Sequence, residues 1–195
     1  MSDVVFPYPF VALDTCCIVT LYASGFMDAI LASLPVRVAF VADVVEEEVR
    51  HMHMGLDERA IPETIALDLS TFVSENLLHT LNLENEVEQT TVVELAFLSN
   101  RKIGNNDLLC SAIAVCRHWS LGTDDKDTIQ MLQRNHPQLH LVTALDLLKY
   151  WADTTHAQFS YVQKAVKNMR KKAMYKPCTK HHLYVWWQSH LAETM

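Results

Sequence analysis

The chain has 195 residues, half of them hydrophobic and 20% charged, with a net charge of −7, which is enough apolar material for one sizeable core. Four glycines and six prolines, with no run rich in Pro or in Ser and Gly, exclude a long flexible linker. Every apolar run is broken by Asp, Glu or Arg before the roughly 18 residues needed to cross a bilayer, so we expect a soluble protein with no membrane partner.

The first half of the chain predicts two buried strands, each followed by a helix. Two prolines precede an apolar run that favours a strand over residues 10–14, because proline cannot lie inside a helix. Apolar residues recur at helical spacing over residues 15–34, and a β-branched run then predicts a buried strand over residues 36–42. We also expect a helix over residues 43–54 and a weaker strand over residues 70–75.

The second half continues the same alternation. Helices are predicted over residues 85–98 and 104–119, the second of them rich in small residues that permit close packing. A short strand, "WSLGT", follows at residues 119–123 and leads into a helix over residues 125–136. A last strand runs into a last helix within residues 139–151. Strands that alternate with helices indicate an α/β fold with a mostly parallel sheet.

Acidic residues follow the predicted strands. They come directly after a strand, in the first turns of the next helix or at the start of the small-residue helix: Asp14, Glu46 to Glu48, Asp107, Asp124 and Asp125. In an open parallel sheet, ligands bind beyond the carboxyl ends of the strands. Four separate segments are therefore expected to bring carboxylates to one edge of the sheet.

Each carboxylate also has a simpler interpretation. Asp14 and Asp107 are each placed to cap a helix N-terminus, and the run of three glutamates is typical of a solvated helix face. Their convergence favours a metal site, because clustered carboxylates raise one another's pKa unless a cation offsets the charge. Carboxylate oxygens are hard ligands, so the expected ion is Mg²⁺ or Mn²⁺.

The spacing of histidines and cysteines in the sequence disfavours a zinc site. His51 and His53 lie two apart on a predicted helix and do not share a face, and His181 and His182 have only Cys178 nearby in the sequence. The five cysteines form no CxxC pair, and no apolar leader follows a basic start, so we expect a reducing, cytoplasmic location.

Four motifs in this order resemble the PIN domain, the nuclease fold of VapC-type toxins and of several RNA-processing endonucleases. The motifs are "VALDTCCI", "VADVVEEEVRH", "NNDLLCSAIAVC" and "LGTDDKD". The resemblance covers about residues 10–150 and implies a three-layer α/β/α fold with a central, mostly parallel sheet. We assign this PIN-like nuclease domain to residues 1–154. By position, the family's catalytic and metal-binding carboxylates fall on Asp14, Glu48, Asp107 and Asp125, with Asp124 a close rival to Asp125.

The resemblance implies a metal-dependent endoribonuclease in which Mg²⁺ or Mn²⁺ polarises a phosphodiester and activates water. It also implies a toxin of a toxin–antitoxin pair, held by a small inhibitory antitoxin-type protein, and we expect a homodimer. Two alternatives remain open: a PIN-like module that binds RNA or assembles with partners without cleaving, and a DNA nuclease.

Residues 155–195 form a basic tail on an acidic body. The tail carries 7 Lys and Arg against 1 acidic residue, whereas residues 1–154 carry 9 against 22. Lysines alternate with aromatic residues, and we expect this extension to be helical. That composition suits single-stranded nucleic acid, whose phosphates meet the cations while its bases stack on the rings. The aromatic residues fit equally well as packing against the body or a second subunit.

Overall fold

The structure is a computed structural model that describes residues 4–41, 52–53, 64–65, 67–100 and 102–192. The described strands are β1 (Phe10–Leu13), β2 (Arg37–Val41), β3 (Met52–His53), β4 (Thr64–Ile65), β5 (His79–Leu81), β6 (Ser120–Gly122) and β7 (Leu141–Val142). The described helices are α1 (Thr15–Ser24), α2 (Met27–Ser33), α4 (Ser70–Ser74), α5 (Glu86–Leu98), α6 (Asn105–Arg117), α7 (Lys126–Asn135), α8 (Ala144–Thr154), α9 (Phe159–Lys172) and α10 (Tyr184–Leu191).

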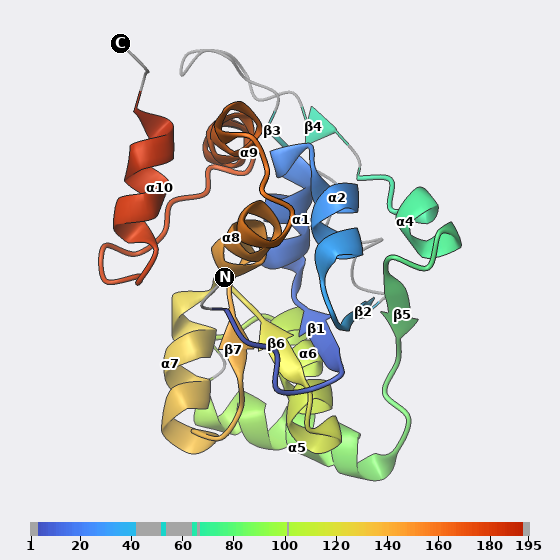
Figure 1. The fold of residues 1–195 in the computed structure, drawn as a ribbon. Helices are drawn as coiled ribbons and strands as arrows, with labels where there is room; N and C mark the ends of the chain where they lie inside the picture. The colour runs from blue at the N-terminus through green and yellow to red at the C-terminus, as the bar shows by residue number, and fades with distance from the viewer. Residues whose placement is uncertain (1–3, 42–51, 54–63, 66, 101, 193–195) are drawn as a thin grey trace.

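A five-stranded sheet in the order β5-β2-β1-β6-β7 forms the centre of the fold (Figure 1). Every pairing in it is parallel, so the carboxyl ends of all five strands meet at one edge. β3 and β4 form a separate two-stranded antiparallel sheet. The prediction of an α/β fold with a mostly parallel sheet is confirmed.

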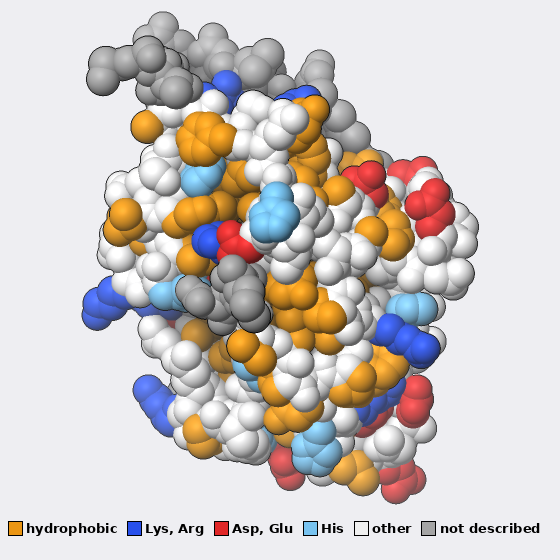
Figure 2. Space-filling view, viewed as in Figure 1, with side chains coloured by type: hydrophobic (Ala, Val, Ile, Leu, Met, Phe, Trp, Pro, Cys, Tyr) orange, Lys and Arg blue, Asp and Glu red, His pale blue; other side chains and the backbone are white. Residues whose placement is uncertain are grey.

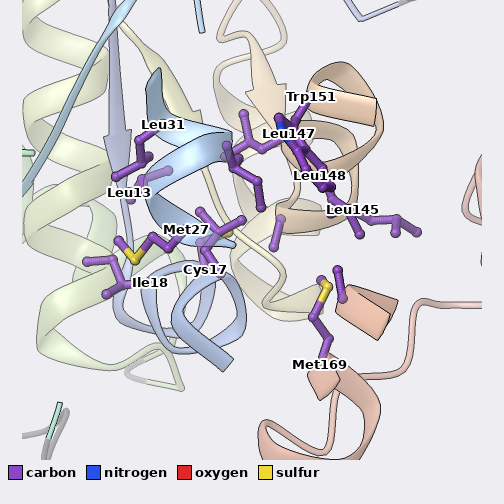
Figure 3. Close-up of a cluster of buried hydrophobic side chains, with 14 of the residues drawn as sticks. Leu13, Cys17, Ile18, Met27, Leu31, Leu145, Leu147, Leu148, Trp151 and Met169 are labelled. Carbon is purple, nitrogen blue, oxygen red and sulfur yellow. The ribbon is translucent and has the colours of Figure 1, made fainter. Parts of the chain in front are cut away.

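Helices cover both faces of the sheet. Side chains alternate along β1: Val11 and Leu13 face a core built with α1, α2, α8 and α9, whereas Ala12 faces a second core built with α5, α6 and α7. Figure 3 shows part of the first core, with side chains of β1, α1, α2, α8 and α9 gathered together. The two cores make the architecture compatible with a three-layer α/β/α fold.

Two predicted elements differ from the structure. Residues 70–74 form helix α4, and the strand of this region lies later, at β5. Asp68 accepts hydrogen bonds from the backbone N and the Oγ of Ser70, and this local bonding favours a helical turn over the strand suggested by Phe72 and Val73. The expected helix over residues 43–54 lies largely outside the described residues, but its last part is wrong, because Met52–His53 is strand β3.

The tail belongs to the first core. Val162, Val166 and Met169 of α9 are buried there together with Tyr175 and Trp187. The lysines of α9 lie on its outer side, exposed or half-buried, which gives the helix one apolar and one basic face. For Tyr175 and Trp187, packing on the body is therefore the observed role. Residues 155–191 extend the core of the α/β body rather than forming a separate core.

Among the described helices, none is by itself both long and apolar enough to cross a bilayer; α1 and α2 meet that criterion only as a pair, bent by 113°. On the face shown in Figure 2, acidic side chains gather at the right and lower edges, over α4 and α5.

Candidate metal centre

Asp14 stands at the carboxyl end of β1 and begins helix α1. Its Oδ1 accepts a hydrogen bond from the backbone N of Cys17 at 2.8 Å, so Asp14 is the N-cap of α1. The Sγ of Cys16 lies 3.0 Å from both carboxylate oxygens. The side chain is wholly buried. Asp14 therefore caps α1 and also lies at the carboxyl edge of the sheet, as predicted.

Asp107 reaches the same region from the first turn of α6. Burial is the main cause of the raised pKa of Asp14, and the nearby charge of Asp107 raises it further. One helical turn later, Cys110 is buried with its Sγ 3.4 Å from the backbone oxygen of Leu13, which fixes α6 against the end of β1. The small residues of this helix, predicted from sequence to allow close packing, therefore bring the Asp107 carboxylate towards Asp14.

Asp124 and Asp125 differ sharply in position. Asp125 is the N-cap of α7 and accepts a hydrogen bond from the backbone N of Thr128 at 2.7 Å. Asp124 points instead to the sheet edge: it accepts hydrogen bonds from the Sγ of Cys17 at 3.3 Å and from the backbone N of Ala144 at 3.2 Å. The geometry thus places Asp124 beside the Asp14 cluster, whereas the sequence motif favoured Asp125 and left Asp124 as a close rival.

Burial dominates the electrostatics of this edge. It raises the pKa of Asp14 to about 7, against hydrogen bonds from Cys16, Thr123 and Cys17, and the nearby charge of Asp107 raises it further. Burial likewise raises the pKa of Asp124 to about 6, and that of the Cys17 thiol well above its usual value. The pKa of the Cys16 thiol is also raised, to about 11, so both thiols of the Cys16–Cys17 pair are protonated near neutral pH.

Asp14, Cys16 and Cys17 offer ligand atoms that all lie within 4.8 Å of one another, so this buried cluster could hold a metal ion. Asp107 and Asp124 are not part of that tight group. Glu48, the fourth predicted carboxylate, lies outside the described residues.

The donor atoms at this edge differ in how readily they bind a metal ion. Protonated thiols are poor ligands, because metals bind the thiolate form. The carboxylates of Asp14, Asp107 and Asp124 are hard oxygen donors at the same edge. Binding at Asp14 would exchange the contact from Cys16 for a bond from the ion, and would lower the pKa of Asp14 by adding positive charge beside it.

A second cluster, absent from the sequence prediction, is formed by Asp146, His181 and His182, whose ligand atoms also lie within 4.8 Å of one another. The adjacent histidines, which lie in the turn before α10, were visible in the sequence, but their partner Asp146 lies on α8. Only the docking of the tail against α8 brings the three together.

No family model, curated protein or solved structure matches this chain.

Proposed function

We propose that the protein is a PIN-like, metal-dependent endoribonuclease that hydrolyses phosphodiester bonds at the carboxyl edge of the sheet. The observation that carries the proposal is the wholly buried carboxylate of Asp14 at the end of β1, within electrostatic reach of Asp107. A buried carboxylate with a pKa raised to about 7 is stabilised by a bound cation. An Asp14 that served only as a helix cap would not need a second carboxylate beside it.

Asp14, Asp107 and Asp124 would hold Mg²⁺ or Mn²⁺ through their oxygens. The ion, when bound, polarises the phosphate and lowers the pKa of a coordinated water. The chain's own contribution is positional: Asp14 is fixed by the Cys17 backbone N, and Asp124 by the backbone N of Ala144 and the phenol of Tyr175. The exposed lysines of the tail supply positive charge for the RNA backbone.

The test is cleavage of single-stranded RNA and of a matched DNA by purified protein with Mn²⁺. We expect RNA cleavage that EDTA abolishes and that Asp107→Asn reduces by more than the roughly 10- to 100-fold typical of an outer-shell residue. Asp127→Asn is the matched control, because Asp127 is exposed in the first turn of α7. Cleavage that persists in Asp107→Asn or in EDTA contradicts the proposal, and cleavage of DNA alone makes the protein a DNA nuclease.

One observation favours a second candidate, a PIN-like module that binds RNA without cleaving it. Each oxygen of Asp14 and Asp124 already has a hydrogen-bond donor, including both thiols of the Cys16–Cys17 pair. A closed, purely structural cluster would look the same. The thermal stability of the protein with and without Mn²⁺ distinguishes the two functions. If the native protein binds Mn²⁺, an Mn²⁺ concentration of about 100 times the Kd stabilises it by about 2.7 kcal/mol. For a chain of this size that raises Tm by roughly 5 to 10 °C, whereas the non-cleaving module shows no shift.

A toxin role, an antitoxin-type partner and a homodimer belong to the same proposal and rest on the motif resemblance. Light scattering of the purified protein tests the homodimer directly.

A further inference from the structure

The Asp146, His181 and His182 cluster lies where the segment after α9 meets the first turn of α8. Asp146 is 6% exposed, His181 half-buried and His182 exposed. The three ligand atoms come from parts of the chain that are distant in sequence, and together they offer two imidazole nitrogens and one carboxylate oxygen. This combination of residue types is the one that transition metals select in proteins.

Hydrogen bonds to one carboxylate oxygen of Asp146 fix its side chain, and the other oxygen remains available to a ligand. Thr143 donates to Oδ2 from both its backbone N and its Oγ1, at 2.8 Å each, and the backbone N of Asp146 donates back to that Oγ1 at 3.1 Å. Within the part of the chain that the structure describes, the buried Oδ1 accepts no well-aligned hydrogen bond. Nε2 of His182 lies 2.9 Å from it. A buried carboxylate oxygen without a hydrogen bond is costly, so a cation at Oδ1 would be favourable.

His181 is oriented by the same network. Its Nδ1 accepts a hydrogen bond from the backbone N of Leu183 at 3.0 Å, which leaves the proton of the neutral ring on Nε2, 3.0 Å from Oγ1 of Thr143. The ring stacks on that of His182, with centroids 4.6 Å apart and planes inclined by 19°. Both imidazoles are thus gathered beside the Asp146 carboxylate before any ion arrives, and His181 would exchange one of its hydrogen bonds for a metal–nitrogen bond.

We propose that Asp146, His181 and His182 bind a divalent transition metal of the zinc class. Three protein ligands, with the fourth position left to water, form the open type of zinc site. Two ligands bound at roughly 2.0–2.1 Å to a tetrahedral ion lie roughly 3.3 Å apart. The 2.9 Å between Oδ1 of Asp146 and Nε2 of His182 is close to that spacing, so a small opening of the pair admits the ion.

The site opens on a cavity of about 660 Å³ between α7, β7 and the segment after α9. Lys126, Lys176 and Lys180 also line this cavity, and their charge favours an anionic fourth ligand such as hydroxide or a phosphate oxygen. Because the two histidines belong to the tail and Asp146 to α8, the bound ion would tie the tail to the body.

The test is titration of the EDTA-treated full chain with Co²⁺, followed by competition with Zn²⁺. Co²⁺ in a tetrahedral site absorbs visible light, and Zn²⁺ should displace it. We expect His182→Gln to weaken Co²⁺ binding by at least about 10-fold, the smallest effect typical even of outer-shell residues. His182 is exposed, so this variant should keep its fold, which far-ultraviolet circular dichroism checks. A wild-type protein that gains no visible absorption, or a His182→Gln variant that binds Co²⁺ as tightly, overturns the proposal.

Three controls separate this site from other ligands. His156→Gln removes an exposed histidine outside the cluster and should leave binding unchanged. Cys178→Ser removes the exposed thiol that lines the same cavity, and loss of the signal there would show a thiolate site and contradict the proposal. Asp14→Asn should keep the Co²⁺ signal even if it abolishes RNA cleavage, so this site and the proposed nuclease site can fail independently.

Discussion

The phenol of Tyr175 donates a hydrogen bond to Oδ1 of Asp124 at 3.0 Å, joining the tail to the carboxyl edge of the sheet. Tyr175 is buried, and its ring also packs edge-on against Trp187 with centroids 5.2 Å apart. The tail therefore holds one of the candidate metal ligands in place.

Removing this hydroxyl should destabilise the fold. Tyr175→Phe keeps the ring packing but deprives a half-buried carboxylate of a donor, so we expect a loss of about 1 to 2 kcal/mol in the free energy of unfolding. Urea denaturation measures it. Tyr161→Phe in α9 serves as control, because Tyr161 is half exposed and should lose close to nothing. Equal stabilities for Tyr175→Phe and the wild type would mean that this bond contributes nothing.

Asp124 and Asp125 should respond oppositely to the same substitution. Asparagine caps helices about as well as aspartate, so Asp125→Asn should retain both stability and RNA cleavage. Asp124→Asn places an amide where the carboxylate accepts hydrogen bonds, and should reduce cleavage by roughly 100-fold or more. Initial rates of RNA cleavage, measured at a temperature below the Tm of both variants, test this difference. The reverse order of rates would restore the assignment made from the sequence motif.

A buried ion pair between α5 and α6 should make stability depend on pH. Nε of Arg117 lies 2.7 Å from Oε1 of Glu88, which is 1% exposed, and this bond lowers the pKa of Glu88. Ionised Glu88 therefore stabilises the fold above its unfolded pKa of 4.5, and the contribution is lost as pH falls through the lower folded value. We expect Glu88→Gln to cost roughly 2 to 3 kcal/mol at about pH 7 and much less at about pH 3. A pH-independent difference in urea denaturation would rule out this role for the charge.

Even alanine should be destabilising at position 122. A Cβ at this position of β6 would collide with Cδ2 of the wholly buried Leu13 on β1, so Gly122→Ala should destabilise the protein by about 1 to 3 kcal/mol. Leu13→Val shortens the colliding side chain. The double variant should therefore lose less stability than the two single losses combined, whereas additive losses would show that the collision is relieved elsewhere.

Much of the fold was predictable because local sequence and tertiary structure agree. Apolar runs bounded by prolines predicted β1 and β2, and the small residues around Cys110 predicted the closely packed α6. The strand predicted over residues 70–75 failed because the side chain of Asp68, not the β-branched residues after it, determines the local backbone.

The sites were only partly predictable. The position of Asp14 follows from the rule that chemistry gathers at the carboxyl ends of parallel strands, and that of Asp107 from the close packing of α6 against β1. Asp124 could not be separated from Asp125, because either side chain could cap α7 and only the fold shows which one does. The Asp146, His181 and His182 cluster depends on how the tail docks, and no spacing in the sequence encodes that contact.

The most direct measurement is anomalous scattering from a crystal soaked in Mn²⁺. We expect a manganese peak between the carboxylates of Asp14 and Asp107, within bonding distance of at least one oxygen of each. A well-ordered crystal with no peak there, or with manganese only at other positions, contradicts the claim that these two carboxylates form a metal centre.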